Sequence, residues 1–149
     1  MTKTTKIEKI IDKLRDPNGG CPWDIKQTHT SLLPYLIEET YELIDAIKDK
    51  NKDSIKEELG DLLLQILLHA KIEDEKGNFN LQDVINILCD KLIRRHPHVF
   101  NKKVKLTDKE LEEQWEEIKN KERKTKNKES PFESINKSQT VLLKALEIS

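Results

Sequence analysis

Two groups of carboxylates are the residues in this sequence best suited to chemistry. Glu38, Glu39 and Glu42 fall within five positions, and Glu58 and Asp61 follow a short distance along the chain. Helix side chains three or four positions apart share a face, so Glu39 pairs with Glu42 and Glu58 pairs with Asp61. If the two segments form an antiparallel helical hairpin, the two pairs face one another.

A divalent cation would explain how four carboxylates can converge. Asp61 is surrounded by Leu59, Leu62, Leu63 and Leu64, so we expect that segment to be buried. An unpaired carboxylate there would cost several kcal/mol or take up a proton, and its neighbours would repel it. Oxygen ligands without histidine or cysteine select Mg²⁺, with Mn²⁺ as a possible substitute. Gly60 fits this picture, because a glycine inside a helix suggests close approach by another backbone or a ligand.

Two other interpretations of the carboxylates fit the sequence less well. They could be surface glutamates of a protein rich in Lys and Glu, but the apolar setting of Asp61 argues against that interpretation. They could also belong to a di-iron bundle, which uses Glu-x-x-His motifs. No glutamate in the sequence is followed three residues later by histidine, and His69 lies more than two turns beyond Glu58.

Positive charge gathers where a later helix is expected to end. Lys91, Arg94 and Arg95 directly precede His96-Pro97, and the residue before a proline is disfavoured in a helix. Cations are favourable at any helix C-terminus, but a cluster of this density also suits an anionic substrate. Arginine can grip phosphate oxygens with two donors, so the pattern is typical of phosphoryl chemistry near a bound metal.

Trp23 lies in a loop of unusual composition around Cys21-Pro22-Trp23-Asp24. The simpler interpretation is that its indole covers the core. The functional interpretation is a flat surface on which a nucleobase could stack.

The apolar spacing predicts an all-α protein. Helices are expected over residues 5–15, from Thr30 or Ser31 to 50, over 54–76, from Asn78 or Asn80 to 96, and from Thr107 onward. Residues 59–70 are apolar nearly all round, which predicts burial on most sides. Residues 119–129 form a charge run, read as a fraying helix end or a linker. Residues 141–148 are apolar on one side only.

Composition limits the class of protein. The chain has 149 residues, which suits one domain, and a net charge of −1 although 37% of residues are charged. Mixed charge of this kind does not indicate a nucleic-acid-binding surface. Two cysteines without a metal-binding spacing predict reduced thiols in a cytoplasmic protein. No signal peptide or membrane-spanning run is visible.

Several motifs together resemble the MazG family of all-α nucleoside triphosphate pyrophosphohydrolases. They are the Cys21-Pro22-Trp23-Asp24 run, the EExxE pattern from Glu38 to Glu42, the ExxD pattern from Glu58 to Asp61, and the run from Lys91 to Phe100. The resemblance covers roughly residues 5–123, so we expect a MazG-like domain over 1–123. Residues 124–149 would form a charged linker and an amphipathic segment.

The resemblance implies a bundle of four to five helices with antiparallel pairs, completed in a homodimer or higher homo-oligomer. It implies Mg²⁺-dependent hydrolysis of nucleoside triphosphates to the monophosphate and pyrophosphate, a house-cleaning activity on nucleotide pools. Carried over to this chain, the metal ligands are Glu39, Glu42, Glu58 and Asp61. Glu38 would handle the attacking water, Lys91, Arg94 and Arg95 would face the phosphates, and Trp23 would contact the base.

Two alternatives remain open at the level of sequence. Many family members carry two such domains, and this chain resembles the first. It could therefore be a weakly active or inactive domain that serves nucleotide binding or assembly. It could also be a pyrophosphatase specific for one deoxy or damaged nucleotide.

Overall fold

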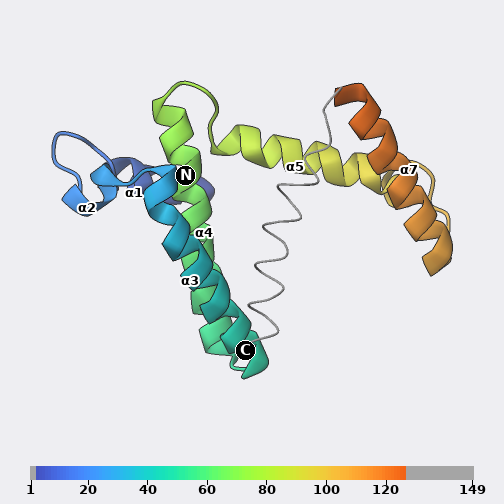
Figure 1. The fold of residues 1–149 in the computed structure, drawn as a ribbon, viewed down its shortest axis with the longest axis horizontal. Coiled ribbons are helices and arrows are strands. Elements are labelled where there is room, and N and C mark those ends of the chain that lie inside the picture. Colours follow the sequence, from blue (N-terminus) through green and yellow to red (C-terminus); the bar gives the residue numbers. More distant parts are fainter. Residues whose placement is uncertain (1–2, 127–149) are drawn as a thin grey trace. The chain divides into compact units, whose positions relative to one another are not determined.

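The computed structural model describes residues 3–126, and these are helical throughout apart from turns and connections. Figure 1 shows the helices along the chain. Their bounds are α1 (Lys3–Leu14), α2 (Pro22–Lys26), α3 (His29–Lys48), α4 (Lys52–Glu75), α5 (Leu81–Arg95), α6 (Pro97–Phe100) and α7 (Asp108–Lys126). The all-α prediction is confirmed. The chain divides into two compact units, Met1–Cys89 and Asp90–Ser149.

Local capping explains where the long helices begin. The Thr28 hydroxyl accepts from the Ser31 backbone N–H, and the Ser31 hydroxyl accepts from the Thr28 N–H, which closes a capping box at the start of α3. At the start of α4, the Asn51 side-chain oxygen accepts from the Ser54 backbone N–H. Gly77, with φ of 75°, follows the end of α4 in a left-handed conformation that glycine adopts without strain.

The core of the first unit lies where α1 and α3 meet the second half of α4. Ile11, Leu32, Leu67, Leu68 and Ile72 form one buried cluster, and Leu32 is fully inaccessible. The helices α3 and α4 run antiparallel side by side (Figure 1), joined by a short turn in which Lys50 adopts a φ of 56°. This hairpin brings the two carboxylate segments to the same level.

Helix α2 was predicted as a loop, and the structure corrects that prediction. This five-residue helix is anchored by Arg15, a side chain outside the helix that is only 8% exposed. The Arg15 guanidinium donates to the carbonyls of Asp24 and Gln27 and pairs with both carboxylate oxygens of Glu75 on α4. The residues around Trp23 therefore form a helical turn fixed to the body of the unit.

The leucine-rich middle of α4 is less buried than predicted. Leu67, Leu68 and Ala70 are buried, but the side chains of Leu59, Leu63 and Ile66 are 52%, 50% and 45% exposed. The prediction of burial on most sides is therefore wrong for the single chain. The exposed residues recur at positions i, i+4 and i+7, which places them on one stripe of the helix.

In the second unit, α7 carries Trp115 and Glu122 toward the end of α5. The segment before α7 includes α6, a single helical turn that lies between the helices predicted from the sequence. Helix α7 continues to Lys126, so the first part of the 119–129 charge run is regular helix rather than a linker. The amphipathic segment 141–148 lies outside the described residues. Within the described helices, none is long and apolar enough to cross a membrane.

Candidate metal and phosphate site

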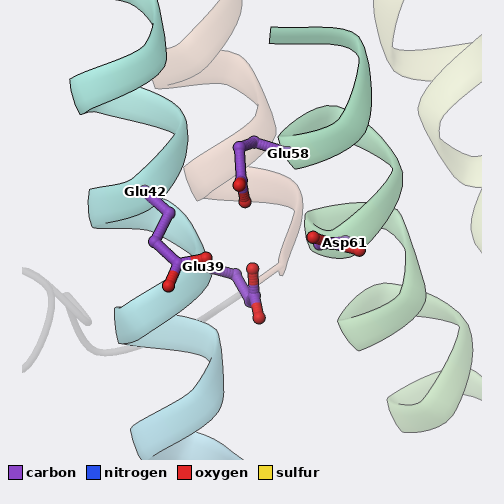
Figure 2. Close-up of side chains that lie close together, drawn as sticks. All are labelled: Glu39, Glu42, Glu58 and Asp61. Atoms are coloured by element: carbon purple, nitrogen blue, oxygen red, sulfur yellow. The ribbon is translucent and has the colours of Figure 1, made fainter. Parts of the chain in front are cut away.

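The α3–α4 hairpin brings together the four carboxylates of the two acidic patterns. Glu39 and Glu42 reach inward from α3, and Glu58 and Asp61 reach inward from α4 (Figure 2). One oxygen from each side chain lies within 4.8 Å of the others. We call these four residues the acidic quartet. Such a group of oxygen donors can hold a divalent cation.

One carboxylate from each helix is both partly buried and repelled by its neighbours: Glu39 of α3 and Glu58 of α4. One oxygen of Glu39 and one of Glu58 are buried without a hydrogen-bond partner. Loss of water around Glu39 and the negative charges of Glu42 and Asp61 raise its pKa to about 7. Burial, and then the charge of Glu42, also raise the pKa of Glu58. The two orphaned oxygens fit a cation, which would supply the missing partner and cancel the repulsion.

The sequence predicted that Asp61 would be the buried, unpaired carboxylate, and the structure corrects that prediction. Asp61 is only half-buried, and Leu59, Leu63 and Leu64 are partly exposed. Gly60 also has open space beside it, because an added Cβ would meet no described atom within 4 Å. No backbone of the described chain therefore requires this glycine. Glu38 is exposed on α3 and lies outside the acidic quartet.

The predicted basic cluster is present at the end of α5, but its members have different environments. Arg94 and Arg95 both pair with Glu122 of α7, at 2.8 and 2.9 Å. Arg95 also lies over the ring of Trp115, with its Cζ 4.9 Å from the centroid. Lys91 is half-buried and forms no ion pair with another residue of the range 3–126. No pattern in the sequence indicated Glu122, which lies in the 119–129 charge run.

Comparison with known proteins places these features in a family. The model of the MazG nucleotide pyrophosphohydrolase domain matches residues 27–100, which include the acidic quartet and the basic cluster. The crystal structure of a MazG-related protein from Thermotoga maritima aligns with a TM-score of 0.65 and 30% identity, covering 78% of this chain and 98% of that one. The chain belongs to the MazG family. The resemblance drawn from its motifs is thereby confirmed.

Longer relatives carry names that state an activity. A nucleoside triphosphate pyrophosphohydrolase/pyrophosphatase MazG of Thermotoga maritima is 55% identical over 131 residues, which is 88% of this chain and 49% of that protein. A nucleoside triphosphate pyrophosphohydrolase of Escherichia coli K12 is 40% identical over 148 residues, or 99% of this chain and 56% of that protein. The chain thus spans about half the length of these MazG relatives.

Trp23 of this MazG chain has an aromatic partner, Tyr35, that was not predicted from the sequence. The rings of Trp23 and Tyr35 meet edge to face, with centroids 5.4 Å apart and planes at 83°. Both side chains are about two-fifths exposed, at 42% and 37%. Tyr35 precedes Glu39 by four residues and therefore lies on the same face of α3. That spacing was a signal available in the sequence.

A pair of histidines links the first turn of α3 to α4. The Nδ1 atoms of His29 and His69 are 2.7 Å apart, and His29 Nε2 lies 2.7 Å from a carboxylate oxygen of Glu73. Only one proton fits between two nitrogens at that distance, so one ring donates and the other accepts. Burial, and then the neighbouring His29, lower the pKa of His69. The contact fixes the end of the hairpin opposite the α3–α4 turn.

Proposed function

We propose that this chain hydrolyses nucleoside triphosphates to the nucleoside monophosphate and pyrophosphate, with Mg²⁺ bound by the acidic quartet. The observation that carries the proposal is the pair of buried, unpartnered carboxylate oxygens on Glu39 and Glu58, set among four converging carboxylates. Membership of the MazG family and the names of the longer relatives support this reaction.

In the proposed reaction, Glu39, Glu42, Glu58 and Asp61 hold the cation. When bound, Mg²⁺ neutralises triphosphate oxygens and orients them for displacement. A water oxygen forms a bond to the α-phosphorus while the bond to the α–β bridging oxygen breaks, so pyrophosphate departs. Glu38 would accept the proton that the water loses, and its exposed position on α3 leaves its carboxylate open to solvent.

The remaining predicted residues would bind the substrate. Lys91, Arg94 and Arg95 would contact the phosphates, as positive charge and multiple donors allow. Trp23 would contact the base, and its edge-to-face contact with Tyr35 together with the anchoring of α2 by Arg15 would keep the indole in place. Stacking on an aromatic face tolerates every base, so this arrangement supports broad substrate choice.

The proposal also includes a second copy of the chain. Both helices of the hairpin expose apolar stripes: Leu33, Ile37 and Ile47 on α3, and Leu59, Leu63 and Ile66 on α4. Exposed apolar surface of this kind marks an interaction site in a soluble protein. We propose that the stripes pack against the same surface of a partner copy in a homodimer.

The experiment is a coupled assay of pyrophosphate release from a panel of NTPs and dNTPs with Mg²⁺. A double variant, Glu42→Gln with Asp61→Asn, removes two ligand charges and is expected to reduce turnover at least about 100-fold. Full turnover in this variant would overturn the mechanism. Mg²⁺-dependent nucleotide binding without product, measured by calorimetry, would show a binding or assembly domain instead. Activity on a single nucleotide of the panel would show a narrow pyrophosphatase.

A further inference from the structure

Two neighbouring arginines of α5 share one carboxylate of α7. Glu122 is 14% exposed, and its Oε1 accepts from Arg94 Nε at 2.8 Å and from Arg95 Nε at 3.4 Å. Its Oε2 accepts from Arg95 Nη2 at 2.9 Å. The three donors give one carboxylate a charge-assisted contact to both guanidinium groups. These hydrogen bonds lower the pKa of Glu122 to about 2, so it stays ionised at any physiological pH.

Arg95 is fixed on two sides by α7. Its guanidinium donates twice to Glu122 and lies over the Trp115 ring, and its side chain is only 19% exposed. A guanidinium held by a carboxylate and an aromatic face has lost most of its freedom to turn toward a ligand. Its role in this geometry is to fasten α7 to the end of α5.

Arg94 is held at one atom only. Its Nε contacts Glu122, whereas Nη1 and Nη2 have no partner among residues 3–126, and the side chain is 48% exposed. Nη1 and Nη2 therefore remain available as donors, and a guanidinium can offer two of them to phosphate oxygens. Two arginine charges and one glutamate charge leave a net positive charge at this place, as an anion requires.

We propose that Glu122 is a positioning residue that divides the work of the two arginines: Arg95 becomes a structural clasp, and Arg94 presents Nη1 and Nη2 to the substrate phosphates. This inference rests on the proposed function, because it assumes that the basic cluster binds a triphosphate. It changes the expectation from the sequence, in which Arg94 and Arg95 were equivalent phosphate ligands.

The test uses the full chain and measures three quantities for each variant. They are kcat and KM for dATP at fixed free Mg²⁺, the inhibition constant of inorganic tripolyphosphate, and the melting temperature. The variants are Arg94→Ala, Arg95→Ala, Glu122→Gln, Glu122→Asp and the double variant Arg94→Ala with Glu122→Gln. The matched control is Glu117→Gln, an exposed glutamate of the same helix.

Arg94→Ala is expected to raise KM and the tripolyphosphate inhibition constant about 10-fold, the size of one charge-assisted contact, without changing the melting temperature. Arg95→Ala is expected to lower the melting temperature. Glu122→Gln should raise both constants about 3- to 10-fold, with a smaller change in kcat. Glu122→Asp should recover part of the loss because it keeps the charge, and Glu117→Gln should resemble wild type.

The double variant separates positioning from simple support of the fold. If Glu122 acts through Arg94, then Glu122→Gln adds no further loss of tripolyphosphate affinity once Arg94 is alanine. An equal loss in both backgrounds would overturn the inference, and so would tighter tripolyphosphate binding by Glu122→Gln, which would show competition instead. A wild-type chain that neither hydrolyses dATP nor binds tripolyphosphate would instead overturn the proposed function.

Discussion

At the scale of single residues, the acidic quartet makes the metal-free protein sensitive to pH. The pKa of Glu39 is raised to about 7, so folding favours its protonated form. A raised carboxylate pKa contributes stability below the pKa of the unfolded chain, and that stability is lost as the pH rises through about 7. Glu122 behaves oppositely: its pKa is lowered to about 2, and the stability it contributes is lost only in strong acid.

Magnesium binding should reveal this sensitivity directly. A cation must displace the proton on Glu39, so its stabilising effect should be larger at pH 8 than at pH 6. The measurement is the rise in melting temperature on adding saturating MgCl₂ at each pH. Comparing the same pH with and without the ion cancels contributions from groups outside the site, such as His69. An equal rise at both pH values would contradict a protonated Glu39.

Repulsion within the quartet predicts the effect of a neutral isostere. Glu58→Gln removes one charge and keeps the shape, so the metal-free variant should melt at a higher temperature than wild type while gaining little from Mg²⁺. Glu57→Gln, on an exposed neighbour, is the control and should keep the response to Mg²⁺. A Glu58→Gln variant that melts lower than wild type without metal would show that the four charges are already compensated.

The spacing of these residues predicted that the four carboxylates lie close together, but not which of their oxygens are buried without a partner. EExxE and ExxD on adjacent antiparallel helices are enough to bring Glu39, Glu42, Glu58 and Asp61 together, because helix geometry is periodic. Which oxygens lose water depends on the rotation of each helix and on side-chain conformation, and neither can be derived from spacing. From the sequence, Asp61 was expected to be the carboxylate buried without a partner. In the structure, the buried oxygens without a hydrogen-bond partner belong to Glu39 and Glu58.

At the scale of elements, the long helices were predictable and the short one was not. Thr28, Asn51 and Gly77 act on their own neighbours in the chain, which keeps the helix ends close to the predicted ones. The predicted starts were still late: α3 begins at His29 rather than at Thr30 or Ser31, and α4 begins at Lys52 rather than at 54. Helix α2 depends on Arg15 and Glu75, which are separated by 60 positions. No local pattern in residues 22–26 contains that information, so the sequence alone predicts a loop there.

The anchoring of α2 by Arg15 should contribute measurably to the free energy of unfolding. Arg15→Met leaves the Glu75 carboxylate and the carbonyls of Asp24 and Gln27 without their donor, so it should reduce the free energy of unfolding by about 2–4 kcal/mol. Because α2 carries Trp23, the proposed base contact should weaken as well, and KM should rise. Denaturant unfolding and nucleotide kinetics measure the two effects.

A conservative variant and a control complete this experiment. Arg15→Lys retains the charge but loses the fork that reaches four acceptors, so its loss should be intermediate. Lys13→Met, on the exposed side of α1, should change neither quantity. A destabilised Arg15→Met protein with wild-type KM would show that Trp23 does not depend on this anchor.

At the scale of the whole molecule, the apolar stripes of α3 and α4 have no cover within the described chain. The sequence showed that residues 59–70 are apolar on nearly every side, and a single sequence does not distinguish burial inside a chain from burial against a partner. The structure separates the two cases residue by residue. Leu67 and Leu68 face α1 and α3, whereas Leu59, Leu63 and Ile66 face outward beside the acidic quartet.

Association through the stripes should therefore be coupled to the site. Leu63 is 50% exposed and lies next to Leu62, one turn beyond Leu59. Leu63→Glu places a charge in the proposed contact, so a dimer should dissociate, which sedimentation equilibrium would show as a halved mass. Since the same segment of α4 carries Glu58 and Asp61, the monomer should also bind Mg²⁺ more weakly.

Ile87→Glu, an exposed apolar residue of α5 outside the hairpin, is the matched control and should preserve the dimer. A wild-type chain that sediments as a monomer, or a Leu63→Glu variant that stays dimeric, would show that this surface is not the contact between copies.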